Sequence, residues 1–141
     1  MRRVLLLSAA VVMSPFAAVA TTLTVEVRDV ESAQGQVYVG LCPRSFEEAQ
    51  CVAGKRLPAK SGTMRFSFPK IAPGRYAVAA YHDVNGNGRL DKQTFGLPAE
   101  PYGFSNDVGR IAPPSHGRAL VAVDGERATI GVRLARMKLT P

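Results

Sequence analysis

Apolar and polar residues alternate along most of this chain, and this alternation predicts β-strands. The period of two recurs over residues 22–30, 36–42, 63–68, 118–124 and 127–134. Because successive side chains of a strand point to opposite faces, each of these segments is expected to bury one face. Residues 75–81 are apolar on both faces, which predicts a central strand. The first two segments are expected to pair as a hairpin through the polar residues 31–35.

Three other stretches interrupt this pattern. Residues 43–50 are expected to hold one helical turn with Ser45 as a plausible cap. Residues 55–57 are expected to add a short edge strand. Residues 83–116 have no sustained periodicity, although short pairings near 94–97 and 108–112 are expected. A connection this long within a domain is usually functional or conceals short elements.

The number and spacing of these strands predict the fold class. At least six strands, no long helix and no internal repeat indicate an all-β protein. We expect an antiparallel β-sandwich of immunoglobulin-like or transthyretin-like type with about seven strands. A small barrel is the alternative. With 141 residues the chain suffices for one such domain, which we place at residues 21–141.

Residues 1–20 have the organisation of a signal peptide. Arg2 and Arg3 precede an apolar run over residues 4–12, and Ala18-Val19-Ala20 forms a small-x-small cleavage site. No later apolar segment is long enough to span a bilayer, so no membrane anchor is expected after cleavage. The sequence therefore predicts a periplasmic or secreted protein.

Charge limits the classes of partner. The chain has 18 basic and 11 acidic residues; without Arg2 and Arg3, 16 basic residues remain, for a net charge of +5. The basic residues are scattered, which is typical of a solvated surface, while attraction to anionic lipid or polysaccharide is the more specific alternative. Basic and aromatic residues do not interleave as in nucleic-acid-binding domains, so no nucleic-acid partner is expected.

The chain has two cysteines, Cys42 and Cys51. In an oxidising compartment they are expected to form a disulfide that closes a short loop over residues 43–50. A metal site is the weaker alternative, because no second pair of Cys or His has finger-like spacing.

Residues 81–91 contain the most distinctive motif. Oxygen-bearing side chains occupy every second position of the loop, and the candidate calcium ligands are Asp83, Asn85, Asn87, the Arg89 carbonyl and Asp91. Gly88 stands where an EF-hand-like loop turns, but Thr94 replaces its bidentate Glu. Such a site would bind Ca²⁺ weakly, with a Kd on the order of 0.1–1 mM. The alternative is turn chemistry alone, because Asn and Gly both tolerate positive φ.

Four further residues are candidates for ligand binding: His82, Tyr102, Phe104 and Asn106. His82 beside Asp83 could act as an acid–base pair, although a histidine at a strand end is more often structural. Tyr102 and Phe104 could stack on a saccharide or hold a peptide, or they could pin the long loop to the sandwich. No nucleophile elbow and no phosphate-binding glycine loop is present.

Two blocks of the sequence together resemble one protein family. The first runs from Phe66 through Pro73-Gly74 to the loop ending at Asp91, and the second is Phe95-Gly96-Leu97-Pro98 followed by Glu100-Pro101-Tyr102-Gly103-Phe104-Ser105-Asn106. This combination resembles the domain of unknown function 2141 family of exported bacterial proteins, from about Leu23 to Leu134. The resemblance implies a secreted or periplasmic β-sandwich and no particular activity.

These features predict an exported, non-enzymatic binding or interaction module, with the long loop as its working surface. Its ligand would be an envelope component, a saccharide or a peptide, and Ca²⁺ is the one candidate cofactor. The alternatives are a structural component of the cell envelope and, less favoured, a small hydrolase or isomerase using His82 and Asp83.

Overall fold

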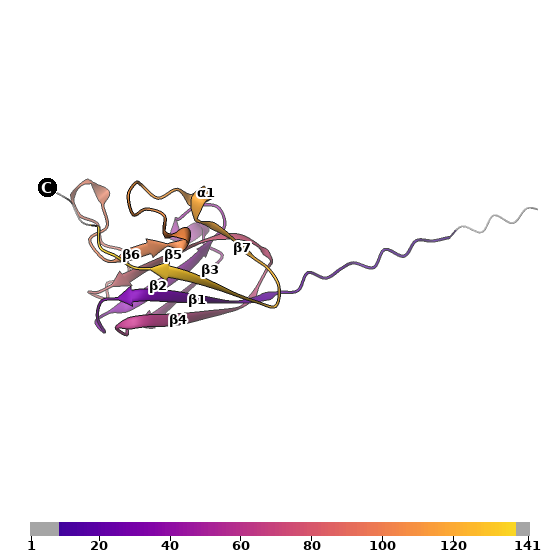
Figure 1. Ribbon diagram of the computed structural model, residues 1–141, viewed down its shortest axis with the longest axis horizontal. Helices are drawn as coiled ribbons and strands as arrows, with labels where there is room; N and C mark the ends of the chain where they lie inside the picture. Colours follow the sequence, from indigo (N-terminus) through magenta and orange to yellow (C-terminus); the bar gives the residue numbers. More distant parts are fainter. Residues whose placement is uncertain (1–8, 138–141) are drawn as a thin grey trace, which may run out of the picture.

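Two β-sheets stack face to face in the computed structural model, which describes residues 9–137 (Figure 1). The first sheet has the order β4-β1-β8, and the second has the order β3-β2-β5-β6, with β7 also paired to β5. The strands are β1 (Thr21–Val30), β2 (Gln36–Cys42), β3 (Ala53–Pro58), β4 (Gly62–Ile71), β5 (Gly74–Asp83), β6 (Tyr102–Phe104), β7 (Leu120–Val123) and β8 (Arg127–Arg133). The predicted β-sandwich is therefore confirmed, with eight strands.

Within residues 9–137, helical structure is confined to short turns between strands. They are the 3-10 helices η1 (Glu48–Gln50), η2 (Thr94–Gly96) and η3 (Ser105–Asp107), and the single turn α1 (His116–Ala119). The turn expected within residues 43–50 is present as η1. Ser45 does not cap it, because the N-cap residue is Glu47, whose backbone N–H donates to the Ser45 hydroxyl at 3.3 Å.

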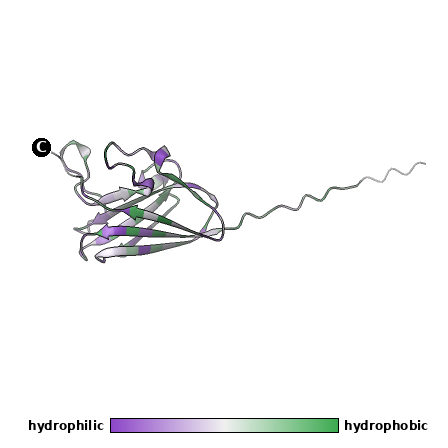
Figure 2. Ribbon diagram, in the orientation of Figure 1, coloured by the Kyte–Doolittle hydropathy of each residue, from purple (hydrophilic) through white to green (hydrophobic). Residues whose placement is uncertain are grey.

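The core lies between the inner faces of the two sheets. Alternate residues of β1 are buried while their neighbours reach solvent, and Figure 2 shows this alternation along the strands. Fully buried side chains include Leu23 and Val25 from β1, Val39 from β2 and Phe66 from β4. Burial of such side chains typically stabilises a fold by about 1.5–3 kcal/mol each. The alternation in the sequence thus identifies the inner faces correctly.

The predicted hairpin between residues 22–30 and 36–42 is wrong. β1 pairs with β4 and β8, whereas β2 pairs with β3 and β5, so the chain crosses from one sheet to the other after Val30. β1 and β8 pair in parallel, and every other pairing of the named strands is antiparallel. Alternation shows which face a strand buries but does not identify its hydrogen-bonded neighbour, and both arrangements bury the same side chains.

β5 is the central strand, as its apolar residues predict. On one edge it pairs with β2 from Ala77 to Asp83, and on the other edge it pairs first with β7 and then with β6. The expected pairings in residues 83–116 are only partly found: Lys92 forms an isolated bridge with Pro98, while residues 108–112 form no strand. The paired segment is instead β6, which has only three residues and too little alternation to be recognised.

The predicted signal peptide, residues 1–20, lies partly outside the described residues. Residues 9–20 belong to no strand or helix, and their side chains are exposed along an extended segment leading away from the sandwich (Figure 1). Within residues 9–137, no helix is both long and apolar enough to cross a bilayer.

Candidate functional site

The loop after β5 is held by the carboxylate of Asp83. This side chain is fully buried, and its two oxygens accept hydrogen bonds from the backbone N–H groups of Asn87 at 3.1 Å and Gly88 at 2.7 Å. Gly86 and Gly88 adopt positive φ angles of 70° and 83°. Asp83 therefore fixes the turn in the way that side chains of this type commonly do.

Asp91 is the centre of a second network in the same loop. Its carboxylate accepts bonds from the side-chain amides of Asn85 at 2.6 Å and Asn87 at 2.8 and 2.9 Å, and Arg89 lies 3.4 Å away. The hydrogen bonds from Asn87 and Asn85, followed by the charge of Arg89, lower the pKa of the Asp91 carboxyl below its ordinary value. Three of the five predicted calcium ligands, Asn85, Asn87 and Asp91, therefore converge through their side chains.

Glu100 closes the base of this loop. Its side chain is buried, and its oxygens accept from the backbone N–H groups of Val84 at 2.9 Å and Asp91 at 3.1 Å. No group of three or more His, Cys, Asp or Glu residues suited to a metal occurs within residues 9–137. The loop is thus tied by protein hydrogen bonds at both ends, and calcium binding by its Asp and Asn side chains stays a prediction from the sequence.

His82 lies apart from the other candidate residues. Its side chain is fully buried, and its Nε2 atom lies 2.6 Å from the carbonyl oxygen of Gln34, while Nδ1 has no hydrogen-bond partner. Because strand side chains alternate, His82 points to the inner face of the second sheet and Asp83 to the outer face. The structure therefore does not bring these two side chains together as a pair.

Three tyrosines form a row across the outer face of the second sheet. Tyr38 of β2 is directly opposite Tyr81 of β5, and Tyr81 is opposite Tyr102 of β6. The rings of Tyr38 and Tyr81 lie 5.2 Å apart, within the range of favourable aromatic pairs. The three side chains are buried and form a second apolar cluster with Leu90 and Phe104. Tyr102 and Phe104 thus help to fasten the long loop to the sheet.

Arg56 extends this row onto β3. Its guanidinium carbon lies 4.6 Å from the centre of the Tyr38 ring, a cation–π contact. Its Nη2 atom donates to the Tyr81 hydroxyl at 2.9 Å, to the carbonyl of Gly88 at 2.9 Å and to Glu48 at 3.2 Å, while Nη1 is buried without a partner. Arg56 therefore joins the tyrosine row, the Asp83 loop and the segment closed by the disulfide.

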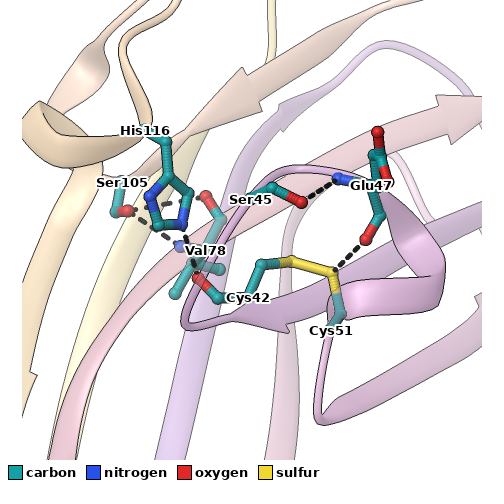
Figure 3. Close-up of a disulfide and its surroundings, with 7 residues drawn as sticks. All are labelled: Cys42, Ser45, Glu47, Cys51, Val78, Ser105 and His116. Atoms are coloured by element: carbon teal, nitrogen blue, oxygen red, sulfur yellow. Dashed lines mark hydrogen bonds between the residues drawn. A yellow bond between two sulfur atoms is a disulfide. The ribbon is translucent and has the colours of Figure 1, made fainter.

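The segment closed by the disulfide brings a fifth aromatic ring to this face. Cys42 and Cys51 are bonded, and the segment between them folds over the end of β2 (Figure 3). Within it, Phe46 packs against Phe104 with ring centres 4.3 Å apart and against His116 at 5.2 Å. The Nε2 atom of His116 lies 2.9 Å from the carbonyl oxygen of Cys42. The disulfide thus holds a phenyl ring over the outer face of the sheet.

A hollow of about 280 Å³ opens between these segments. Ala79 of β5 contributes a small side chain to it, and Tyr38, Tyr81, Tyr102, Phe46 and Phe104 contribute aromatic rings. Its charged lining residues are Glu48, Arg89 and Lys92. Burial is the main cause that raises the pKa values of Tyr38 and Tyr81, so both phenols are neutral near pH 7. The hollow therefore offers apolar and aromatic walls with cationic groups at one side.

Asn106 and Ser105 form structural hydrogen bonds beside the hollow. The Asn106 amide donates to the backbone carbonyl of Arg118 at 2.9 Å. The buried Ser105 hydroxyl accepts from the backbone N–H of Val78 at 2.9 Å and donates to the carbonyl of Ala119 at 2.5 Å. Both residues thereby attach the end of β6 to neighbouring segments, and Figure 3 shows the bond between Ser105 and Val78.

The sequence did not identify four residues of this face: Tyr38, Tyr81, Phe46 and Arg56. A signal was present for two of them, because Tyr38 and Tyr81 stand at outward positions of strands whose inward positions are apolar. A large aromatic at an outward position indicates that something covers that face. Phe46 and Arg56 carry no such signal, since their places depend on the disulfide and on the pairing of β3 with β2.

Comparison with family models gives a match over most of the chain. Residues 25–131 match the family described as "Uncharacterized protein conserved in bacteria (DUF2141)". Searches of curated proteins and of solved structures returned no match. The matched region contains the hollow, the Asp83 loop and the disulfide, and the chain belongs to this bacterial family.

Proposed function

We propose that this member of the family is an exported, non-enzymatic binding module whose ligand site is the aromatic hollow. The observation that carries the proposal is convergence: the disulfide-closed segment, the loop from Asp83 to Asp91 and β6 all line one hollow on a single sheet. These segments are far apart in the sequence, and each is fixed by its own bonds. A rigid sheet that positions several loops around a cavity is a common arrangement for a binding site.

The lining defines the ligand class. Five aromatic rings and the Ala79 side chain favour an apolar or planar body, and the volume of about 280 Å³ limits it to a small molecule or to one group of a larger one. Of the charged lining residues, Glu48 is paired with Arg56 at 3.2 Å and Arg89 with Asp91 at 3.4 Å, whereas Lys92 forms no ion pair within residues 9–137. We therefore infer that the ligand combines a compact apolar group with an anionic group.

The non-enzymatic part of the proposal is supported by the state of the acid–base candidates. Asp83 already accepts two backbone hydrogen bonds, and His82 is buried on the other face of the sheet. A catalytic pair must reach a substrate and exchange a proton with it. Neither side chain reaches the hollow in this arrangement.

A pair of matched substitutions tests the site. Ala79→Leu places a larger side chain in the hollow, and Ala122→Leu makes the same change at an exposed position of β7. The probe is 1-anilinonaphthalene-8-sulfonate, which is aromatic and anionic, followed by its fluorescence and by calorimetry. We expect saturable binding that Ala79→Leu weakens at least about tenfold, as loss of one well-packed apolar contact would. Ala122→Leu should leave it unchanged.

The need for an anionic group on the ligand is tested by comparing a charged and a neutral compound. 1-Naphthoate and the neutral 1-naphthalenemethanol share an apolar body, so preference for the carboxylate reports the anionic group. Equal weakening by Ala79→Leu and Ala122→Leu would remove the hollow as the site. Equal affinity for the two naphthalenes would leave the site in place but refute the anionic ligand class.

A further inference from the structure

Two loop tips expose large apolar side chains on one side of the molecule. Phe95, in the loop before β6, is 94% exposed, and Ile111, in the loop after η3, is fully exposed. In Figure 1 both loops, coloured salmon and orange, project from the same side of the sandwich, beyond β6. Single exposed apolar residues are common on protein surfaces, so further observations must separate these two from that background.

The backbone at Phe95 is the first such observation. The loop is closed like a small hairpin by the bridge between Lys92 and Pro98 and by the bond from Gln93 N–H to Leu97 C=O. At its tip Phe95 has a φ angle of 67°, in the left-handed region that Asn or Gly adopts at lower cost. The chain thus exposes a phenyl ring to solvent from a residue whose backbone conformation is unfavourable. Outliers of this kind are a reason to look for function.

The charge around the two tips is the second observation. Lys92 lies in the Phe95 loop, and Arg118 and Ile111 line one surface depression, which is separate from the aromatic hollow. Both basic side chains are exposed, and neither takes part in an ion pair within residues 9–137. The nearby acid Asp107 is engaged by Arg110 at 2.7 Å and by Arg133 at 3.0 Å. Each exposed apolar tip is therefore accompanied by an uncompensated cation.

We propose that this pair of loop tips docks on an anionic lipid surface. Phe95 and Ile111 would enter the interface between headgroups and acyl chains, while Lys92 and Arg118 meet the anionic headgroups. Apolar insertion combined with attraction of basic residues is the general basis of peripheral membrane binding. A bilayer is favoured over a protein groove because it accepts two separate tips without a matching shape and complements the cations. Lys92 also lines the aromatic hollow, whereas Phe95, Ile111 and Arg118 do not, so both apolar tips lie outside the ligand site.

The test uses the chain from Thr21 onward, because every strand lies in that part and residues 9–20 are exposed and would themselves associate with lipid. Sedimentation with vesicles of phosphatidylcholine containing 40% phosphatidylglycerol, set against pure phosphatidylcholine, measures binding. The variants are Phe95→Ser and Ile111→Ser. Val52→Ser, which changes another exposed apolar residue, is the matched control. Because these side chains are exposed, the substitutions should leave folding intact.

We expect binding to the anionic vesicles only, with each tip variant weakened about tenfold and Val52→Ser unchanged. Lys92→Glu combined with Arg118→Glu should weaken binding similarly, and added salt should weaken the wild type. Absence of binding, or equal effects of Phe95→Ser and Val52→Ser, would overturn the proposal. So would a dimer in light scattering that Phe95→Ser converts to monomer, because the tips would then contact a second copy. Ala79→Leu should leave vesicle binding unchanged, which separates this surface from the ligand site.

Discussion

Ser105 lies where β5 changes from one strand partner to the next, and removal of its hydroxyl should destabilise the fold. β5 pairs with β7 through Gly74–Ala77 and with β6 through Ala79–Tyr81, so Val78 has no strand neighbour on that edge. The Ser105 hydroxyl serves there instead, accepting from the Val78 N–H and donating to the Ala119 carbonyl. Ser105, Val78 and Ala119 are all fully buried. Water therefore cannot replace these bonds without opening the structure.

Ser105→Ala should lower the free energy of unfolding by about 2–4 kcal/mol. Each buried backbone group left without a partner costs about 1–3 kcal/mol, and the substitution leaves one donor and one acceptor unpaired. With a urea slope of about 2 kcal/mol/M, the midpoint should fall by about 1–2 M. The control is Ser45→Ala, whose hydroxyl accepts an exposed bond from Glu47 N–H, and which should change stability by no more than about 0.5 kcal/mol. A loss below about 1 kcal/mol for Ser105→Ala, or equal losses for the two variants, would refute this reasoning.

Three further predictions concern the segments around the hollow. Replacing Cys42 and Cys51 together by serine should lower the free energy of unfolding by about 2–3 kcal/mol in urea titrations, because the eight-residue loop is freed in the unfolded chain. The double substitution should also weaken probe binding. An effect on stability alone would show that Phe46 is dispensable for binding. If the sequence-based calcium prediction holds with a Kd of about 1 mM, 10 mM Ca²⁺ should stabilise the protein by about 1.4 kcal/mol in thermal melts; superimposed melts in Ca²⁺ and in EDTA would leave the loop as turn chemistry. The pKa of Asp91 is lowered in the fold, so its contribution to stability is complete above the ordinary carboxyl pKa and is lost as the pH falls through the lowered value. Asp91→Asn should therefore reduce the loss of stability over that acidic range, measured by urea titrations at several pH values. The same dependence of stability on acidic pH in the wild type and the variant would contradict this.

The sequence predicted the layers of this fold better than their connections. Alternation in β1 and in β4 identified inward positions such as Val25 and Phe66, because burial of one face is a local property of each strand. Pairing depends on contacts between distant residues: β1 lies beside β8, which follows more than ninety positions later, and β2 lies in the other sheet. No local pattern distinguishes that arrangement from a hairpin.

The candidate site was predicted in parts. Asp83, Tyr102 and Cys42 were singled out because each belongs to a motif with its own chemistry, but nothing in the sequence places these motifs on one face. Their convergence comes from the order of the second sheet, where β2, β5 and β6 are neighbours. Tyr38 and Arg56 were missed because their importance depends on that order. A face of this kind becomes visible only when strand neighbours are known.

The order of the second sheet also explains why so much of the irregular chain gathers on one side. On the outer face Gly40 and Gly54 are paired neighbours, and an added Cβ at either would approach the Tyr38 hydroxyl to 2.8 Å. The glycines therefore allow Tyr38 to lie flat across the sheet, where Arg56 stacks on it and reaches Gly88 of the loop. A side chain at position 40 or 54 would lift the tyrosine and separate Arg56 from the loop. The sheet surface is thus shaped to hold its covering segments, and the hollow is the space that they leave open between them.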